Sequence, residues 1–299
     1  MPSRIEPTSI GPLSGWRITT PYGSALVAQQ GAQLLSYTPA GGRPLIWLSD
    51  EAVFKPGTSV RGGVPVCWPW FGVYERNPQA VRDSVAAPAG AGSHGWVRQA
   101  DWQLALQTTE DESATLAFTY TAAREHVPGW DHHAEVTLRM RFGKNIQMNL
   151  AIRNQGDAAL TTSMALHTYL AVSDSRHVTI HGLEGHQYLD TLSPQWEQRE
   201  QHGHVTLEGE VDRIYLNTTT PITLQDPGWQ RDIRLQATGA KSTVVWNPGP
   251  DKAARLKDMA NDAWQNMACI ETGRVLDDAM TVAPGTTESV SLMISWQSR

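Results

Sequence analysis

Two side chains that can exchange protons stand in otherwise apolar stretches of the sequence. His167 lies in the strand-like run Ser163–Leu170, and Glu271 directly follows three apolar residues. Partial burial would lower the pKa of His167 from its usual value of about 6.5, and burial raises the pKa of a carboxyl group, so both could do acid/base work. Each also has an ordinary structural explanation, a packed strand histidine and an edge-strand carboxylate facing water. The residues alone leave both interpretations open.

Two glycine-containing loops add cationic side chains. The first is Arg61–Gly72 (RGGVPVCWPWFG), where paired glycines free the backbone and prolines restrict it. The second is Ser93–Arg98 (SHGWVR), with a histidine and an arginine four residues apart. The planar fork of a guanidinium suits phosphate or carboxylate recognition. A tight structural loop and a surface histidine are the alternatives for these two segments.

Aromatic residues are also placed outside the expected strands. Rings in loops can stack on the apolar C–H faces of a pyranose, and they can equally close the ends of a β-sandwich as core. Six of the 12 tryptophans are expected in Gly- and Pro-rich loops: Trp68, Trp70, Trp96, Trp130, Trp246 and Trp264.

Several kinds of chemistry have no support in the sequence. Cys67 and Cys269 lie far apart and outside any CxxC or Cys/His spacing, so neither a disulfide framework nor a zinc site is predicted. No phosphate-cradling GxxxxGK[ST], GxGxxG or GxSxG element is present. We therefore expect acid/base chemistry without a cofactor or a metal ion.

The charge balance limits the partners. The chain has 24 basic and 30 acidic residues, a formal charge of -6, which argues against a nucleic acid or an anionic membrane as partner. No leader-like apolar segment and no apolar run of about 20 residues is found. With two thiols expected to be reduced and buried, we expect a cytoplasmic protein.

The elements that must position these residues are mainly strands. Alternating apolar and polar residues predict half-buried antiparallel strands at 116–120, 136–142, 146–152 and 290–296, with turn sequences between them. One short helix is predicted at Asp251–Ala260, opened by Pro250. The fold class is all-β, with two large antiparallel sheets packed face to face.

No repeat or linker divides the chain, so residues 1–299 are predicted to form a single domain. Pro88–Gly92 is expected to be a small flexible insert before the SHGWVR segment.

Six segments in this order resemble the glucose-6-phosphate 1-epimerase branch of the aldose 1-epimerase family. They are RGGVPVCWPWFG, SHGWVR, ALHTYLAVSD, VDRIY, VVWNP and ACIETGRV, and the resemblance covers about residues 16–296. It implies a galactose-mutarotase-like β-supersandwich with one or two short helices. It also implies interconversion of the α and β anomers of a hexose 6-phosphate, glucose 6-phosphate first of all.

The resemblance implies roles for the two proton-exchanging residues. His167 corresponds to the general acid at the ring oxygen and Glu271 to the general base that takes the anomeric hydroxyl proton. Ring opening needs both transfers, and reclosure on the other face of the aldehyde reverses them. His94 and Asp212 correspond to residues that hold the ring oxygen or hydroxyl groups.

The same resemblance assigns the phosphate to Arg61 and Arg98. Ser93 stands in the substrate-binding segment where many relatives carry Gln. This chain also has Gly249-Pro250 and Glu271-Thr272 where relatives usually carry an aromatic residue and Glu-Pro. These departures concern the choice of substrate rather than the fold.

Other functions remain open at this stage. One is a mutarotase for unphosphorylated aldoses, and another is a carbohydrate-binding or regulatory protein without catalysis. A glycoside hydrolase would need two carboxylates, for which Glu271 and Asp212 are the sole candidates. The expected partner is a small phosphosugar, and the expected state is a monomer.

Overall fold

The alternating segments form long antiparallel strands, as predicted. The computed structural model describes residues 2–87, 91–125, 127 and 130–299. The four predicted strands are β7 (Ser113–Ala122), β8 (Ala134–Phe142), β9 (Ile146–Asn154) and β22 (Thr287–Ser298). In β8 and β9 every second side chain is buried, which is the expected result for one face against the core.

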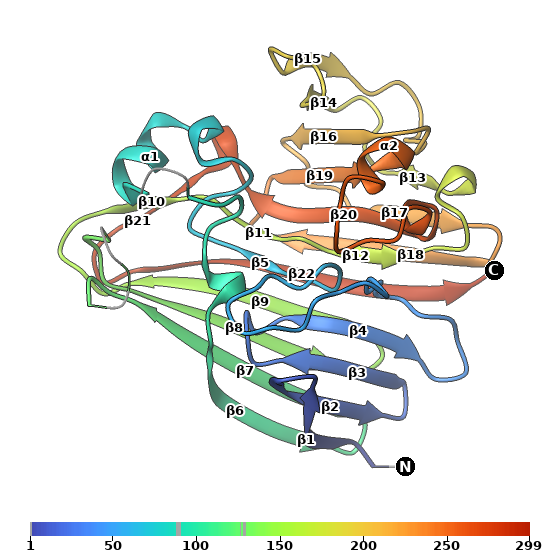
Figure 1. Cartoon of the computed structure of the whole chain (residues 1–299), viewed down its shortest axis with the longest axis horizontal. Helices are drawn as coiled ribbons and strands as arrows, with labels where there is room; N and C mark the ends of the chain where they lie inside the picture. The colour runs from blue at the N-terminus through green and yellow to red at the C-terminus, as the bar shows by residue number, and fades with distance from the viewer. Residues whose placement is uncertain (1, 88–90, 126, 128–129) are drawn as a thin grey trace.

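These four strands form the centre of an eight-stranded antiparallel sheet (Figure 1). Its order is β13-β17-β18-β22-β9-β8-β7-β6. The remaining members are β13 (Thr179–His181), β17 (Ile222–Asp226), β18 (Arg231–Thr238) and β6 (Gln103–Glu110).

A second eight-stranded sheet carries the candidate catalytic residues. Its order is β15-β14-β16-β19-β20-β11-β5, and β12 pairs with β20 beside β11. Its strands are β15 (Glu197–Glu200), β14 (Gln187–Asp190), β16 (Val211–Leu216), β19 (Ser242–Asn247), β20 (Met267–Arg274), β11 (Met164–Leu166), β12 (Tyr169–Ala171) and β5 (Val66–Cys67).

Two smaller sheets complete the β-structure in the part of the chain that the structure describes. The N-terminal sheet consists of β1 (Arg4–Ile10), β2 (Leu13–Thr20), β3 (Gly23–Ala28) and β4 (Leu34–Pro39), and β10 (Leu160–Thr162) pairs with β21 (Met280–Val282). Figure 1 shows β1–β4 lying across β6–β9. Trp16 on β2 meets Phe118 on β7 edge to face at 5.1 Å, so the core lies between these layers.

Strand β20 is buried on both faces, unlike β8 and β9, in which burial alternates. Ala268 and Ile270 join the main core, whereas Met267 and Cys269 join a separate apolar cluster on the other face. Because side chains alternate along a strand, Glu271 shares the face of Cys269. Glu271 is therefore directed away from the main core.

The helical segments are short and partly differ from the prediction. α1 spans Gln79–Val85 and was not predicted individually; Val81 and Val85, one turn apart, are its buried residues. Among the described residues, five 3-10 turns are found at Tyr74–Arg76, Val97–Gln99, Ser175–His177, Ala263–Asn266 and Leu276–Asp278.

The predicted helix at 251–260 was wrong in its extent. α2 spans Gly249–Ala253, and Arg255 and Leu256 continue it with tighter turns. Beyond it, the carbonyl of Asp258 accepts a hydrogen bond from Ser49 and its carboxylate pairs with Arg61. These tertiary contacts draw the chain out of the helical path.

The placement of the tryptophans is corrected in part. Trp246 lies inside β19 rather than in a loop, and Trp68, Trp70 and Trp130 are buried in the main core. For these three rings the core interpretation therefore holds.

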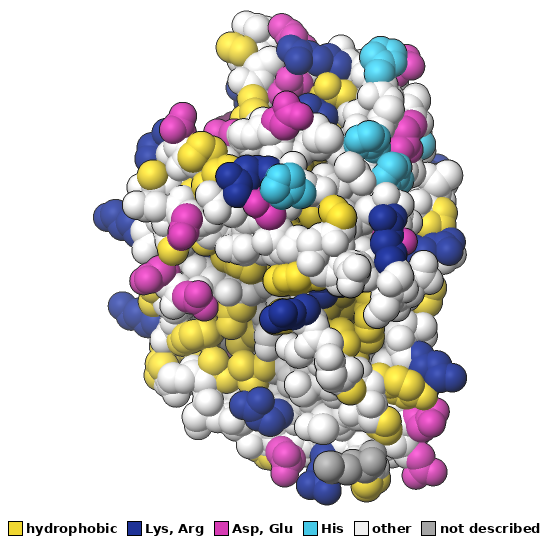
Figure 2. All heavy atoms as spheres, turned by 90° about the vertical axis from the view of Figure 1, so that its right-hand side faces the viewer, with side chains coloured by type: hydrophobic (Ala, Val, Ile, Leu, Met, Phe, Trp, Pro, Cys, Tyr) yellow, Lys and Arg dark blue, Asp and Glu magenta, His cyan; other side chains and the backbone are white. Residues whose placement is uncertain are grey.

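The helices, the surface charges and the cysteines agree with what the composition indicated. No helix in the described residues is long and apolar enough to span a membrane. Figure 2 shows acidic and basic side chains interspersed over one face. Both cysteines are free and buried, and most of the insert predicted at Pro88–Gly92 lies outside the described residues.

Candidate active site

A cavity of about 500 Å³ brings together all seven residues singled out in the sequence. Its volume lies within the usual range for small-molecule sites. The seven are Arg61, Ser93, His94, Arg98, His167, Asp212 and Glu271.

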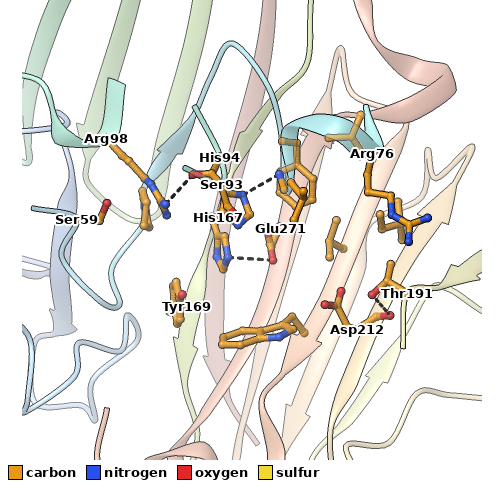
Figure 3. Close-up of a pocket in the computed structure, with 18 of the residues that line it drawn as sticks. Ser59, Arg76, Ser93, His94, Arg98, His167, Tyr169, Thr191, Asp212 and Glu271 are labelled. Atoms are coloured by element: carbon orange, nitrogen blue, oxygen red, sulfur yellow. Dashed lines mark hydrogen bonds and ion pairs between the residues drawn. The ribbon is translucent and has the colours of Figure 1, made fainter. Parts of the chain in front are cut away.

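The centre of the cavity is formed by His167 and Glu271. His167 Nε2 lies 3.3 Å from Glu271 Oε1, and the two side chains are 9% and 2% exposed (Figure 3). Glu271 thus lies on an interior strand, not on an edge facing water. His167 Nδ1 and Glu271 Oε2 are buried and have no hydrogen-bond partner among the described residues. Buried polar atoms are normally hydrogen-bonded, because leaving them unpaired costs free energy. These two atoms are therefore free to form hydrogen bonds with a bound ligand.

His167 occupies an interruption between two strands. β11 ends at Leu166 and β12 begins at Tyr169, and both pair with β20. The backbone N–H of His167 donates to the carbonyl of Pro65 instead of to β20. The interruption directs the imidazole toward Glu271 on the neighbouring strand.

Aromatic rings fix the orientation of the imidazole. The ring of Tyr169 stacks on His167 at 4.7 Å, while His94 and Trp246 contact it edge to face at 5.4 and 6.1 Å. Trp246 also lines the cavity. Of the six tryptophans considered for stacking on a sugar, it is the one in the described cavity lining.

Burial shifts the protonation of the pair in opposite directions. Desolvation lowers the pKa of His167 well below its usual value, and the charges of Arg61 and Arg98 act in the same direction. Desolvation, together with the charge of Asp212, raises the pKa of Glu271. The pair therefore holds one proton over a wide pH range, as neutral imidazole and carboxylic acid or as their ion-pair tautomer.

His94 is held in a strained loop beside this pair. Its backbone adopts φ +66°, a conformation that is uncommon outside glycine. Gly95, at φ +68°, follows so closely against Trp68 that an added Cβ would lie 1.8 Å from the carbonyl oxygen of Trp68. Such strain persists where the surrounding structure fixes a functional group.

The protonation state of His94 follows from its contacts. Burial, Arg98 and Arg61 lower its pKa to about 3. Its Nδ1 accepts a hydrogen bond from the backbone N–H of Gly72. The neutral ring therefore carries its proton on Nε2, which makes it a hydrogen-bond donor for a ligand.

One end of the cavity is cationic. Arg61 Nη1 donates to the hydroxyl of Tyr169 at 3.1 Å, and its Nε pairs with Asp258 at 3.2 Å. Arg98 donates to the backbone carbonyl of Ser93 at 2.7 Å and has no carboxylate partner among the described residues. The positive charge of Arg98 is thus left for an anionic ligand.

Asp212 lies on β16 on the other side of the pair from Arg98 (Figure 3). Burial raises its pKa to about 6, against the opposing effect of Lys252 and a hydrogen bond from Thr191. A carboxylate in this position can accept hydrogen bonds from sugar hydroxyl groups.

The cavity wall also contains three residues that were not predicted from the sequence, Arg76, Trp196 and Leu276. Arg76 lies over the ring of Trp196 at 5.2 Å, at the end of the cavity near Asp212 (Figure 3). Trp196 and Leu276 have φ of +55° and +53°, so residues at this end of the cavity adopt the same uncommon left-handed conformation as His94. Tyr169, which contacts Arg61, could have been found from its position two residues after His167 on a strand.

Fold and site together define a β-sandwich enzyme of sugar isomerisation, and the chain belongs to the aldose 1-epimerase family. The family profile matches residues 15–295.

Individual relatives support this family. An Escherichia coli K12 protein described as a candidate glucose-6-phosphate 1-epimerase is 33% identical over 84% of this chain and 80% of its own length. A protein from Cenchrus ciliaris with the same description is 30% identical over 85% of this chain and 76% of its own length.

Solved structures show the fold. The candidate mutarotase YeaD of Salmonella typhimurium has a TM-score of 0.88 at 28% identity, over 99% of this chain and 94% of its own. A galactose mutarotase-like protein of Clostridium acetobutylicum has a TM-score of 0.80 at 12% identity, over 100% and 99% of the two chains. The galactose-mutarotase-like all-β fold predicted from the sequence is confirmed.

Proposed function

We propose that this protein interconverts the α and β anomers of a hexose 6-phosphate, with glucose 6-phosphate as first choice. The observation that carries the proposal is the buried contact of 3.3 Å between His167 and Glu271, next to the cationic end at Arg61 and Arg98. The relatives described as candidate glucose-6-phosphate 1-epimerases support the choice of substrate.

In this proposal the pair acts as a proton exchanger. The ring oxygen and the anomeric hydroxyl are bonded to the same carbon, so two groups in mutual contact can reach both. His167, as imidazolium, gives its proton to the ring oxygen while Glu271, as carboxylate, takes the hydroxyl proton and the C1–O5 bond breaks. The products are the open aldehyde, a neutral imidazole and a carboxylic acid.

Reclosure uses the same groups in reverse. After rotation about C1–C2, the O5 hydroxyl attacks the other face of the carbonyl, returns its proton to His167, and the new O1 receives a proton from Glu271. The neutral pair favoured by burial is thus the state reached after ring opening. No cofactor is needed because the reaction has no net proton or electron transfer.

The remaining residues position the substrate. Arg61 and Arg98 bind the 6-phosphate by charge-assisted hydrogen bonds, with Ser93 in the same loop. His94 donates from Nε2 to a ring or hydroxyl oxygen, and Asp212 accepts from a hydroxyl at the far side. Fixing both ends holds C1 against the pair.

The test is direct measurement of anomer exchange. Purified protein is added to freshly dissolved α-glucose 6-phosphate, and the optical rotation or the NMR exchange rate is followed against the spontaneous reaction. We expect clear acceleration with glucose 6-phosphate and a lower kcat/KM with glucose. A rate equal to the spontaneous one would refute the proposal, and a preference for free glucose would favour the unphosphorylated aldoses.

We also propose that the protein works as a single-domain monomer. The support is that one chain supplies the acid, the base, the cationic end and the walls of the cavity. The two buried free thiols fit a reducing compartment, and so a cytoplasmic location.

A further inference from the structure

A third type of metal ligand lies on the face of β20 that carries Glu271. Cys269 precedes Glu271 by two residues, so the two side chains share this face. In the sheet register Cys269 lies between Tyr169 on β12 and Trp246 on β19, both of which line the cavity. One ligand atom each from His167, Cys269 and Glu271 lie within 4.8 Å of one another, and all three residues are buried.

The distances suit a tetrahedral ion. Zn–N and Zn–O bonds of about 2.0–2.2 Å place two ligands of a tetrahedral zinc about 3.3–3.6 Å apart. His167 Nε2 and Glu271 Oε1 are already 3.3 Å apart. With a Zn–S bond of about 2.3 Å the sulfur belongs about 3.6 Å from these atoms. The sulfur of Cys269 lies within 4.8 Å of the ligand atoms of His167 and Glu271, so a shift of about 1 Å would bring it to this distance.

The pair also has free ligand capacity. Glu271 Oε2 and His167 Nδ1 are buried without a hydrogen-bond partner in the described part of the chain. The proposed reaction uses His167 and Glu271 but gives the thiol of Cys269 no task. The proposed reaction therefore does not explain why a nitrogen, a sulfur and an oxygen ligand atom lie together in one buried cluster.

We propose that His167, Cys269 and Glu271 form an inhibitory site for a thiophilic divalent cation, of which Zn²⁺ is the representative. A set of one nitrogen, one sulfur and one oxygen ligand suits borderline-soft ions, whereas Mg²⁺ and Ca²⁺ prefer oxygen ligands. The fourth position faces the cavity and takes a water molecule. Two protons leave to solvent when the ion binds, one from the thiol and one from the His167–Glu271 pair, because the ligands are a thiolate, a neutral imidazole and a carboxylate.

The consequence for activity follows from the shared residues. A bound ion occupies the lone pair of His167 and the carboxylate of Glu271, so neither can exchange protons with a sugar. Inhibition therefore rests on the proposed function, whereas binding of the ion does not.

The two cysteines provide a matched pair of variants for the binding test. Both are fully buried and free, and Cys67 lies on β5, outside the three-residue cluster. Co²⁺ replaces Zn²⁺ as a spectroscopic probe, because a cobalt–thiolate bond gives an intense near-ultraviolet charge-transfer band. We expect the band in the wild type and in Cys67→Ala, its loss in Cys269→Ala, and its displacement by Zn²⁺.

A second arm measures inhibition of glucose 6-phosphate anomerisation by Zn²⁺. Loss of an outer-sphere partner alone commonly costs about 10–100-fold in metal affinity, so loss of a ligand should cost at least about tenfold. We expect Cys269→Ala to need at least that much more Zn²⁺ for half inhibition than the wild type or Cys67→Ala. EDTA should restore the rate, and Mg²⁺ should not inhibit.

Surface histidines require a control. Figure 2 shows histidine side chains gathered in the upper part of one face, and the rings of His181 and His204 lie 5.2 Å apart. Zinc bound there would remain in Cys269→Ala and gives no thiolate band. Cys269→Ser, checked by circular dichroism, replaces the alanine variant if that one does not fold.

The outcomes are distinct. Absence of the thiolate band in the wild type, or equal zinc inhibition of the wild type and the Cys269 variant, overturns the inhibitory site. If the protein does not accelerate anomerisation at all, the proposed function fails while the cobalt spectrum still reports on the site.

Discussion

His167 Nε2 lies 3.3 Å from Glu271 Oε1, although one residue stands at the break between β11 and β12 and the other in the middle of β20. The contact is buried, and each side chain keeps one unpaired polar atom within the described structure. In the proposed reaction the pair shares one proton and exchanges protons with two oxygens that are bonded to the same sugar carbon.

Removing either member of the pair should abolish catalysis. A positioned general acid or base contributes about 10²–10⁴-fold, so Glu271→Gln and His167→Ala should each bring anomerisation of glucose 6-phosphate down to the spontaneous rate. Glu271→Gln keeps the volume of the buried side chain. Polarimetry measures the rate, and thermal unfolding followed by circular dichroism checks the fold.

Two variants outside the cavity serve as controls for this loss. Glu288→Gln changes a carboxylate on β22 that pairs with Arg274, and His202→Ala changes an exposed histidine. Both should keep the wild-type rate. Wild-type activity in Glu271→Gln or His167→Ala would contradict the assignment of the pair.

The pH profile should show a broad plateau. Burial lowers the pKa of His167 from 6.5, so the second proton binds to the pair, and activity falls, only at a pH well below 6.5. Burial raises the pKa of Glu271 from 4.5, so the shared proton is lost only at a pH well above 4.5. The one-proton state is the active one, and it persists between these limits.

The profile of kcat/KM reports these groups in the free enzyme. Asp212, with a pKa raised to about 6, titrates in the same range, and Asp212→Asn separates its contribution. Repeating the series with glucose removes the titration of the substrate phosphate. An acid limb centred at or above pH 6.5 in Asp212→Asn would show that the pair does not share its proton as described.

Loss of a cavity arginine should act on phosphate recognition. Hydrogen bonds to charged groups contribute about 1.5–3 kcal/mol, so Arg98→Ala should reduce kcat/KM for glucose 6-phosphate by about 10- to 150-fold. Arg61→Ala should do so as well, with an added loss from its contacts to Tyr169 and Asp258. The value for free glucose should change far less.

Arg76 is the matched control for this prediction, because it lines the same cavity at the opposite end. Arg76→Ala should leave the ratio of the two kcat/KM values close to that of the wild type. Equal losses for both sugars in the Arg98 variant would remove the support for a phosphate at this end.

The loop that holds His94 should depend on Gly95. Its φ of +68° and the 1.8 Å approach of an added Cβ to Trp68 leave no room for alanine. Gly95→Ala should lower the free energy of unfolding by about 2 kcal/mol or more and reduce activity through displacement of His94. Gly92→Ala, in the same loop with no atom within 4 Å of the added Cβ, should change neither. Similar melting temperatures for both variants would contradict this.

Sequence alone indicated four of the long strands, β7, β8, β9 and β22. Apolar and polar residues alternate along β8 and β9, and this alternation can be read from neighbouring residues alone. It matches the structure because one face of each strand is buried and the other is more exposed. The short helices were less predictable, since the end of α2 depends on the distant contact of Asp258 with Arg61. The ordered motifs then indicated the family, which the profile match confirmed.

Only the tertiary structure decided which residues meet. Nothing in the residues around His167 distinguishes a packed histidine from a catalytic one, because the distinction depends on what lies across the sheet. Arg76 lies in a 3-10 turn and Trp196 in a loop, and only tertiary packing brings them together at the far end of the cavity. The spacing of two residues puts Cys269 on the same face as Glu271, but strand pairing puts both beside His167. Sequence sets which side chains alternate to the inside, and long-range pairing sets their neighbours.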